Sequence, residues 1–310
     1  MYFISCDWGT TNFRLRAVET NTAAVRAEWN TDQGIRATNE GFLASGQAGR
    51  FDFFAAYLSE QIDQLPAEYR RAPMVASGMA SANIGMCELP YANLPINPSG
   101  DNLITRRFTL PAGNDLLLIS GVRTADSIMR GEEVQALGLM ANMPDDGTLI
   151  LPGTHSKHLT YEGGAFTDFS TYLTGELFAL LTNHGILSGS VAAGPFDAAA
   201  EAAFGEGVEQ GRSGSLSRSL FGVRVRQVVH GHTPETNYYY LSGLLLGEEL
   251  GGLANTQGTV YLAAAEPVFS LYHRALTTLV VSDRLRSFGG DALESALLAG
   301  QIKILLQHGG

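Results

Sequence analysis

One pattern occurs near the start of each half of this chain: a strand, a turn rich in glycine and hydroxyl groups, and a return strand. The first copy is centred on Asp7-Trp8-Gly9-Thr10-Thr11 and the second on Pro152-Gly153-Thr154-His155-Ser156. The strands expected around them are 2–6, 13–17 and 25–29 in the first half, and 148–151, 157–161 and 165–169 in the second. One such hairpin is weak evidence, but two that each open a three-strand meander indicate a duplicated α/β chain.

The residue types of the first motif suit an anionic ligand. Gly9 permits positive φ and leaves the backbone accessible, while Thr10, Thr11 and Asn12 add polar groups beside backbone N–H donors. Such a turn can hold phosphate oxygens. Asp7 ends the preceding strand, where its carboxylate could bind a hydrated Mg²⁺. The first motif alone is equally compatible with an ordinary hairpin that has a polar turn.

Composition excludes several classes of protein. A length of 310 residues is enough for two domains, and 45% hydrophobic with 16% charged residues is typical of a globular protein. We expect no membrane span, because no apolar run approaches about 20 residues. Without an apparent signal peptide, and with only Cys6 and Cys87 as cysteines, a cytoplasmic location is expected.

The net charge of −11 argues against nucleic acid or an anionic membrane as a partner. An acidic protein that binds anionic ligands must place positive charge locally. Lys157 and Lys303 are the only lysines of the sequence, so the position of Lys157 directly after the second motif is informative. We expect Lys157 and Arg14 to offset phosphate charge.

The first half is expected to be mixed α/β. It contains a loop over 34–49, a helix over 51–65, a strand over 73–77, a long loop over 78–95, a strand over 115–120 and a stretch over 127–138 that enters a helix. The loop that starts at Gly78 follows the carboxyl end of a strand, where active-site loops lie; a plain surface loop is the equal alternative. Glu132 and Glu133 occupy the first helical turn, where compensation of the helix dipole is the simplest role.

Breaker residues at 142–147 predict the domain boundary, which gives domains 1–144 and 145–310. The second half is expected to contain a helix over 174–184, irregular or short-helical structure over 188–219, a helix over 233–251, a strand over 259–263, a helix, a strand over 278–281 and a final helix. Gly289-Gly290-Asp291 with Glu294 is expected to cap that final helix.

The motifs resemble those of the 2-dehydro-3-deoxygalactonokinases, within the actin, hexokinase and Hsp70 ATPase superfamily. Besides the two turns, the resemblance rests on Gly78-Met79, Glu88-Leu89-Pro90-Tyr91, Met129-Arg130-Gly131-Glu132-Glu133, Thr174-Gly175-Glu176-Leu177 and Leu241-Ser242-Gly243-Leu244-Leu245. It implies two ribonuclease-H-like domains with an active-site cleft between them. It also implies ATP-dependent phosphorylation of 2-dehydro-3-deoxy-D-galactonate at the 6-hydroxyl, in galactonate breakdown.

The resemblance assigns roles to named residues. Glu132 or Glu133 would be the base, with Asp7 holding Mg²⁺ and Arg130 on phosphate or on the substrate carboxylate; Asp126 and Asp168 are weaker candidates for the base. Nucleotide contacts would come from Gly9, Thr10, Thr11, Asn12, Arg14, Gly153, Thr154, His155, Ser156, Lys157 and Ala265. Sugar-acid contacts would come from Gly78, Met79, Ser81, Asn83, Glu88 and Tyr91. In the superfamily the late strand-to-helix turn usually carries glycines, whereas here it is Ala264-Ala265-Glu266-Pro267.

Two other classes of function stay open at this point. A phosphohydrolase of the exopolyphosphatase kind would place water where the sugar hydroxyl sits. A non-catalytic nucleotide-dependent switch would keep both hairpins and need neither glutamate. The histidines lack metal-site spacing, and no Gly-x-x-x-x-Gly-Lys-Ser/Thr loop occurs. The preference among keto-deoxy sugar acids and the existence of a homodimer are left open.

Overall fold

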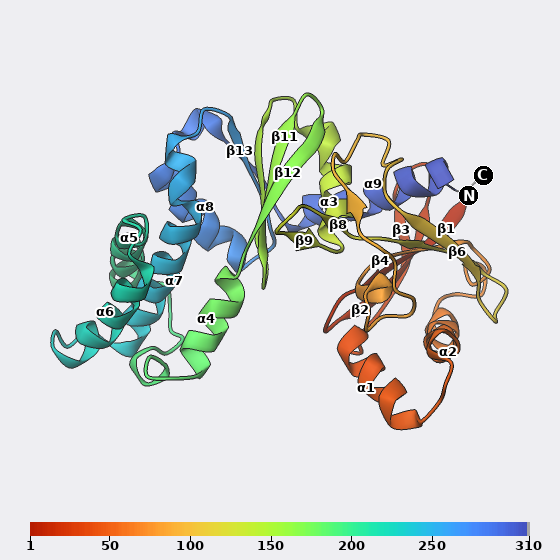
Figure 1. Ribbon diagram of the computed structural model, residues 1–310, viewed down its shortest axis with the longest axis horizontal. Coiled ribbons are helices and arrows are strands. Elements are labelled where there is room, and N and C mark those ends of the chain that lie inside the picture. Colours follow the sequence, from red (N-terminus) through yellow and green to blue (C-terminus); the bar gives the residue numbers. More distant parts are fainter. Residues whose placement is uncertain (309–310) are drawn as a thin grey trace. The chain divides into compact units, whose positions relative to one another are not determined.

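The computed structural model describes residues 1–308 (Figure 1). The chain divides into two compact units. Unit 1 comprises Met1–Pro144, Tyr161–Phe169 and the segment from Asp291 onward, and unit 2 comprises Asp145–Thr160 and Ser170–Gly290. The change at 144/145 coincides with the boundary expected from the sequence. The tip of one hairpin and the last helix, which that expectation placed in the second domain, group instead with unit 1.

Unit 1 is built on a six-stranded sheet of order β3-β2-β1-β4-β7-β6. Its strands are β1 (Tyr2–Trp8), β2 (Phe13–Glu19), β3 (Val25–Thr31), β4 (Met74–Gly78), β6 (Thr105–Thr109) and β7 (Asp115–Ile119). The first three form an antiparallel meander, β4 and β7 run parallel to β1, and β6 is antiparallel to β7. A small sheet joins β5 (Ala92–Asn93), β8 (Val122–Arg123) and β9 (Ile128–Met129).

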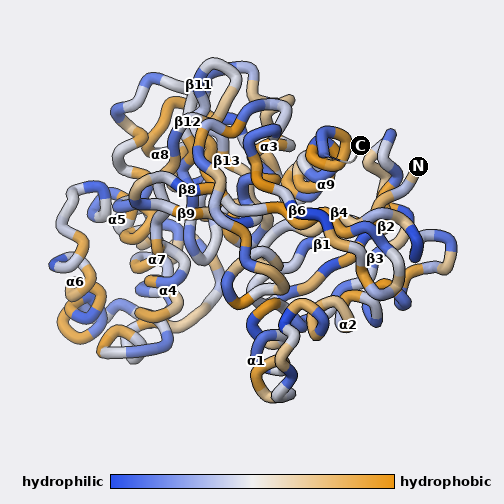
Figure 2. The backbone as a smooth tube through the Cα atoms, turned by 45° about the vertical axis from the view of Figure 1, so that its right-hand side comes forward, coloured by the Kyte–Doolittle hydropathy of each residue, from blue (hydrophilic) through white to orange (hydrophobic). Residues whose placement is uncertain are grey.

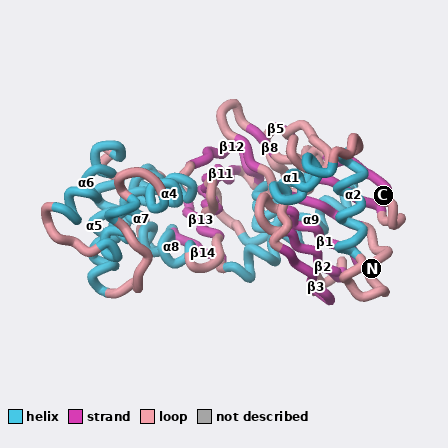
Figure 3. Tube along the Cα trace, turned by 90° about the horizontal axis from the view of Figure 1, so that it is seen from below, coloured by secondary structure: helices cyan, strands magenta, loops and turns pink. Residues whose placement is uncertain are grey.

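Helices cover both faces of this sheet (Figures 1 and 3). They are α1 (Ile35–Ser45), α2 (Arg50–Ile62), α3 (Glu132–Leu139) and α9 (Gly290–His308). Phe54 and Leu58 of α2 pack into one core with alternate residues of β1, β2, β4 and β7. On the opposite face, Gln301 of α9 donates to the Cys6 carbonyl oxygen at 3.3 Å and to Ser77 Oγ at 3.0 Å.

Helix α1 corrects the expectation of a loop over 34–49. Only Ile35 and Thr38 of this helix are buried, so its sequence shows no apolar repeat at helical spacing. Its N-terminal backbone bonds to a neighbouring turn, as described below. Tertiary contacts therefore fix the helix, which its sequence pattern does not predict.

Unit 2 repeats the strand order of unit 1. Its sheet contains β10 (Gly147–Leu151), β11 (Ser156–Glu162), β12 (Ala165–Tyr172), β13 (Thr259–Ala263) and β14 (Leu285–Phe288), in the order β12-β11-β10-β13-β14. β13 is parallel to both β10 and β14. Three consecutive strands followed by two parallel ones therefore occur twice. The expected class, α/β with a duplicated ribonuclease-H-like topology, is confirmed.

Helices form the rest of unit 2. They are α4 (Thr174–Asn183), α5 (Ala198–Gly211), α6 (Leu216–Val228), α7 (Pro234–Leu250) and α8 (Val268–Leu279). Leu246 and Leu250 of α7 and Leu276 of α8 pack against β10 and β13. Short 3₁₀ turns lie at Met79–Ser81, Met140–Asn142, Ser188–Ser190, Gly251–Asn255 and Ser282–Arg284.

Two expectations for this half were wrong. The segment 188–219 is mostly regular helix because its glycines serve helix packing: a Cβ at Gly207 of α5 would come within 2.2 Å of the Tyr240 carbonyl oxygen in α7. A Cβ at Gly243 of α7 would likewise come within 2.1 Å of the Phe204 carbonyl oxygen. Residues 278–281 end helix α8 and lead out of it, and the strand lies later, at β14.

Hydropathy changes repeatedly along single elements, as expected when each buries one face (Figure 2). Among the residues that the structure describes, no helix is both long enough and apolar enough to cross a membrane.

Candidate active site

The first turn (residues 9–12) joins β1 to β2 and is held by the start of α1. Within the turn, the Gly9 N–H donates to the Asn12 carbonyl oxygen at 2.9 Å. The Ile35 N–H donates to the Gly9 carbonyl oxygen at 2.9 Å, and the Arg36 N–H donates to that of Thr10 at 3.1 Å. The first N–H groups of a helix have no partner inside the helix. Here the carbonyl groups of the turn supply partners for two of them.

The approach between this turn and the helix is very close. A Cβ at Gly34, which precedes α1, would lie 2.4 Å from the Thr11 carbonyl carbon and 2.5 Å from the Thr10 oxygen. Only glycine fits there. The start of α1 therefore supports the first turn from behind.

The other groups of the first turn remain available to a ligand. Within residues 1–308, no hydrogen bond engages the backbone N–H or the side chain of Thr10, Thr11 or Asn12. Thr11 and Asn12 are exposed. The carbonyl oxygens of the turn accept hydrogen bonds from the protein, whereas these N–H and side-chain donors have no such partner among the described residues. This is the arrangement expected of a turn that binds anions.

Asp7 lies near the end of β1, beside Ser77 of β4 and Arg14 of β2. Burial raises the pKa of the Asp7 carboxyl, although the nearby Arg14 and Arg16 guanidinium groups partly oppose this. A Cβ at Gly78 would lie 2.8 Å from the Trp8 carbonyl oxygen and 3.7 Å from Asp7 Oδ1. With φ of +85°, Gly78 keeps open the space beside the carboxylate.

The start of α3 lies against Gly78, at the end of β4. A Cβ at Gly131 would lie 3.3 Å from the Gly78 Cα atom, and Gly131 has φ of +113°. The two acidic side chains that follow fold back onto the backbone: Glu132 Oε2 accepts the Arg130 N–H at 3.0 Å, and Glu133 Oε2 accepts the Gly131 N–H at 2.7 Å. Two of the expected catalytic regions, Asp7 and the start of α3, therefore adjoin within unit 1.

Glu133 is the more perturbed of the two acids. Its side chain is fully buried. Burial, together with the neighbouring Glu132 charge, raises the pKa of Glu133 to about 8. Its Oε1 atom is buried and has no hydrogen-bond partner among the described residues. A buried carboxyl group with a raised pKa, next to a functional strand end, is a candidate proton acceptor.

Arg130 holds the loop expected to bind the sugar acid. Its Nη1 donates to the Ser81 carbonyl oxygen at 2.7 Å and to Ser81 Oγ, and its Cζ lies 4.2 Å from the centre of the Tyr91 ring. Such stacking of a cation on an aromatic ring is favourable. Arg130, Ser81 and Tyr91 therefore form one group; each was a candidate from the sequence, and their mutual contacts are seen only in the structure.

The remaining sugar-acid candidates are distributed along this loop. Gly78 and Met79 start it, while Asn83 and Glu88 are exposed farther on. Of the two weaker candidates for the base, Asp126 is exposed and accepts a hydrogen bond from Thr124 Oγ1 at 3.1 Å, and Asp168 is exposed on β12.

Arg14 and Glu294 have different partners from those expected. Arg14 Nη1 lies 2.7 Å from Glu294 Oε1, and Arg16 Nη2 lies 3.0 Å from Glu294 Oε2. Glu294 thus uses both carboxylate oxygens on arginines of β2, which corrects its expected role as a cap of the final helix. Arg14 would need to exchange this partner for a phosphate.

The second turn (residues 152–155) is supported by the start of α4. The Glu176 N–H donates to the Thr154 carbonyl oxygen at 3.0 Å, and a Cβ at Gly175 would lie 2.4 Å from the Gly153 oxygen. The Glu176 carboxylate also bonds to His155 Nε2 at 2.6 Å. Glu176 was part of the family resemblance, but the sequence suggested no role for it.

Two expected nucleotide ligands after this turn are buried. Lys157 is 3% exposed, and its Nζ donates to the His155 carbonyl oxygen at 2.7 Å. Ser156 is fully buried and donates through Oγ to Glu249 Oε1 at 2.6 Å. Its hydroxyl hydrogen therefore points into the protein, so the structure does not favour Ser156 as a direct phosphate donor.

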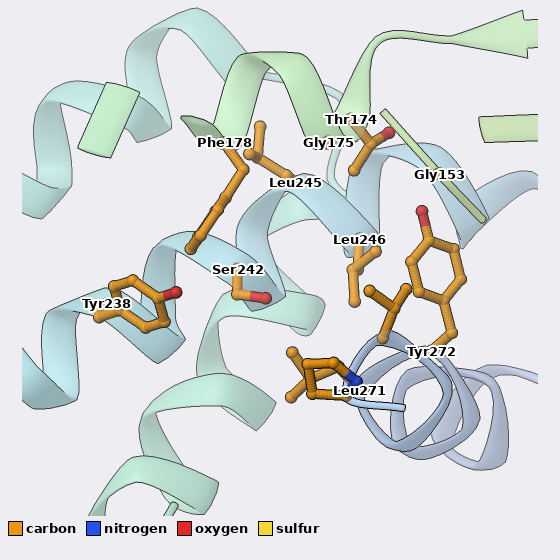
Figure 4. A pocket seen from close by; sticks show the side chains of 12 residues that line it. Gly153, Thr174, Gly175, Phe178, Tyr238, Ser242, Leu245, Leu246, Leu271 and Tyr272 are labelled. Atoms are coloured by element: carbon orange, nitrogen blue, oxygen red, sulfur yellow. The ribbon is translucent and has the colours of Figure 1, made fainter. Parts of the chain in front are cut away.

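A pocket of about 200 Å³ opens beside the second turn (Figure 4). It is lined by Gly153, Thr174, Gly175, Phe178, Tyr238, Ser242, Leu245, Leu246, Pro267, Val268, Leu271 and Tyr272. The walls are largely apolar, with a few hydroxyl groups, as is common for small-molecule sites. Ala265 is not part of the lining; the adjoining residues Pro267 and Val268 are.

The duplicated sheets, each with a glycine-containing turn supported by a helix start, define a two-domain protein of the actin-like ATPase class. Residues 7–301 match the family model described as 2-keto-3-deoxy-galactonokinase. The chain belongs to this family.

Individual relatives agree with the family match. A protein of Rhizobium meliloti (strain 1021), named as a probable 2-dehydro-3-deoxygalactonokinase, is 32% identical over 286 residues, which are 89% of each chain. The Escherichia coli (strain K12) 2-dehydro-3-deoxygalactonokinase is 28% identical over 287 residues, covering 89% of this chain and 90% of the relative. A crystal structure of a Sinorhizobium meliloti protein described as a 2-dehydro-3-deoxygalactonokinase has a TM-score of 0.79 at 29% identity. It covers 96% of this chain and 95% of the other.

Proposed function

We propose that this protein transfers the terminal phosphoryl group of ATP to the 6-hydroxyl of 2-dehydro-3-deoxy-D-galactonate, in galactonate breakdown. The observation that carries the proposal is the match of residues 7–301 to one family of sugar-acid kinases. The site agrees with it, because phosphoryl transfer needs positioned phosphates, a metal and a group that orients the attacking hydroxyl.

Unit 1 would supply the groups that act on the reacting atoms. Its first turn offers Thr10, Thr11 and Asn12 donors without protein partners, suited to phosphate oxygens. The loop from Gly78 to Tyr91 would receive the sugar acid. Arg130 holds Ser81 and Tyr91 in this loop, so its guanidinium would orient the loop and place a positive charge near the substrate.

Glu133 is the proposed proton acceptor for the sugar hydroxyl. Its Oε2 is fixed by the Gly131 N–H, which leaves Oε1 as the atom that can take the proton. With a pKa of about 8, Glu133 can accept a proton only in its ionised form, which is the minority below pH 8 and grows as the pH rises through 8; that carboxylate is a stronger base than an ordinary glutamate. Glu132, whose Oε2 is bound by the Arg130 N–H, would mainly stabilise the helix start.

A magnesium ion fits this site with Asp7 as its protein ligand. The Asp7 carboxylate has no hydrogen-bonded partner among the described residues, and burial raises its pKa despite the nearby Arg14 and Arg16, so a bound Mg²⁺ would favour its ionised form. No group of three or more His, Cys, Asp or Glu residues within 1–308 forms a metal cage. This suits a Mg²⁺ that keeps water and phosphate ligands. When bound, such an ion neutralises charge on the transferred phosphoryl group.

Unit 2 would hold the nucleotide. The second turn would face the phosphates, with the buried Lys157 ammonium bonded to the His155 carbonyl oxygen as a positive charge behind it, and the adjoining apolar pocket would take the nucleoside. The proposed domain roles are therefore a sugar-acid-binding unit 1 and a nucleotide-binding unit 2. A cytoplasmic location and a homodimer are compatible with this proposal and are separate questions.

A coupled assay for ADP over a panel of keto-deoxy sugar acids and neutral sugars tests the function. We expect turnover with 2-dehydro-3-deoxy-D-galactonate and little with galactose. Equal turnover of both would overturn the acid-specific proposal. Release of free phosphate without any sugar would point to a phosphohydrolase, and nucleotide binding without turnover would point to a switch.

A further inference from the structure

A buried carboxylate lies behind the second turn. Glu249, near the end of α7, is 4% exposed. Its Oε1 accepts Ser156 Oγ–H at 2.6 Å and bonds to His158 Nε2 at 2.9 Å, and its Oε2 accepts the Tyr272 hydroxyl at 2.8 Å. Removing a carboxylate from water costs free energy unless its oxygens are satisfied, and here both are.

The surroundings of Glu249 favour its ionised form. An ionised carboxylate only accepts hydrogen bonds, so Ser156, Tyr272 and His158 Nε2 are then the donors. Burial alone would raise the pKa of Glu249. The hydrogen bond and charge of His158, together with the Ser156 and Thr174 hydroxyls, outweigh burial and lower this pKa below the usual value. Glu249 is therefore an anion with fixed donors.

The donors come from both parts of the proposed nucleotide site. Ser156 directly follows the second turn, while Thr174 and Tyr272 line the apolar pocket, where Figure 4 shows both side chains. His158 lies on β11, and the centre of its ring is 4.5 Å from that of Tyr172. One carboxylate thus connects the strand that carries the phosphate-facing turn with two walls of the pocket.

Helix α7 is itself held rigidly. Gly243 and Gly247 of α7 face α5 so closely that a Cβ at either would come within about 2.2 Å of its backbone. The backbone of α7, which carries Glu249, therefore cannot shift easily relative to α5.

We propose that Glu249 is a positioning residue for the nucleotide, which fixes the second turn and the Tyr272 wall of the pocket in one relative geometry. The inference rests on the proposed function of unit 2 as the ATP-binding unit. Glu249 touches no substrate in this scheme. It acts through Ser156, Tyr272 and Thr174. Its loss is therefore expected to weaken nucleotide binding more than sugar-acid binding.

The principal test compares Glu249→Gln with Glu248→Gln. The amide keeps the size of the side chain but presents an NH₂ group to side chains that are themselves donors. The neighbouring Glu248 is exposed on the same helix and serves as the matched control. For Glu249→Gln we expect KM for ATP, and Kd for ADP measured by calorimetry, to rise about tenfold. KM for the sugar acid should stay within about twofold, and Glu248→Gln should leave all three values unchanged.

Two milder variants keep the inference testable if Glu249→Gln does not fold. Ser156→Ala and Tyr272→Phe each remove one donor and should each raise KM for ATP by a few-fold. A parallel rise in both Michaelis constants, or unchanged ADP binding in all three variants, would overturn the inference. Wild-type protein that binds ADP but phosphorylates no sugar acid would overturn the proposed function instead, because the ADP comparison does not depend on turnover.

Discussion

The two turns share a strand–turn–strand form and differ in what secures them. In both, a helix N-terminus donates to a turn carbonyl oxygen, and a glycine permits the contact: Gly34 before α1 and Gly175 in α4. The first turn has no further side-chain bonds among the described residues. The second is also bound through Glu176, and Glu249 bonds to Ser156 directly after it.

This difference suggests a division of labour. The donors of the first turn are free to follow the transferred phosphoryl group, and they lie on the same unit as Asp7 and Glu133. The second turn is fixed before any ligand arrives, as suits a site that binds the part of the nucleotide that does not react. Preorganisation of this kind improves binding, whereas interactions made only in the transition state raise turnover.

The largest expected effect is on unit 1. Glu133→Gln should lower kcat by roughly 10²- to 10⁴-fold, because the proton acceptor is lost, with ATP and sugar-acid binding retained. Steady-state kinetics and calorimetry check this, with Glu132→Gln as the matched control, expected to change kcat little. If both variants keep near-normal kcat, the base lies elsewhere and Asp126 becomes the first candidate.

The next largest effect is expected for Asp7→Asn. It should lower kcat on the order of 10²-fold or more, because it removes a charge that acts on the metal-bound triphosphate. The fold should persist, because the substitution removes a buried charge and keeps the shape. The exposed Asp32→Asn is the control. A variant at position 7 that turns over at close to the wild-type rate in saturating Mg·ATP would contradict the assignment.

The raised pKa of Glu133 predicts a pH dependence of stability. In the unfolded chain the group ionises near pH 4.5, whereas in the folded state it keeps its proton up to about pH 8. The contribution of Glu133 to the free energy of unfolding is therefore fully present below about pH 4.5 and is lost as the pH rises through 8. Relative to Glu133→Gln, the free energy of unfolding of the wild type should fall by about 2–4 kcal/mol between pH 4.5 and 8.5. Urea unfolding of the two proteins over this pH range measures the difference. If the difference in their free energies of unfolding is the same at every pH, Glu133 is not protonated in the folded state.

The smallest effects concern the two supporting glycines. Gly34→Ala and Gly175→Ala each place a methyl group 2.4 Å from turn backbone, and each should cost about 1–3 kcal/mol of stability. Gly34→Ala should depress kcat more, and Gly175→Ala should raise KM for ATP more. Gly222→Ala in α6, where a Cβ meets nothing within 4 Å, should stabilise by about 0.5–1 kcal/mol. Identical kinetic profiles for the first two would remove the distinction between the turns.

Local patterns predicted the sheets well. Alternation and turn residues located β1, β2, β10 and β11, and the repeat between halves predicted the shared strand order. Helices α1 and α5 were not predicted, because they are stabilised by contacts with residues that are distant in the sequence. The start of α1 bonds to a turn some 25 residues earlier, and α5 buries glycines against α7, which a scan for apolar spacing cannot detect.

The same limit applies to the site. Asp7 is proposed from its place at a strand end beside a polar turn, whereas Arg130 and the pair Glu132 and Glu133 are proposed from the family resemblance; all of these roles stay predictions. Glu249 could not be proposed from the sequence, because its donors are Ser156, His158 and Tyr272, up to 93 residues away along the chain. The partner of Arg14 lies 280 residues away. That Arg14 is already paired with Glu294 can be seen only in the folded structure.

The position of α9 has a consequence for how the protein is made. This helix packs Gln301 against Cys6 and Ser77, and Gly300 against Val134, all within unit 1. A ribosome therefore releases every strand of the first sheet long before the helix that covers one face of it. Until α9 emerges, unit 1 exposes apolar surface beside the strand ends that carry Asp7 and Gly78. A nascent chain would thus complete the surroundings of Asp7 only once α9 has been made, so products that stop before α9 should be inactive and prone to aggregate.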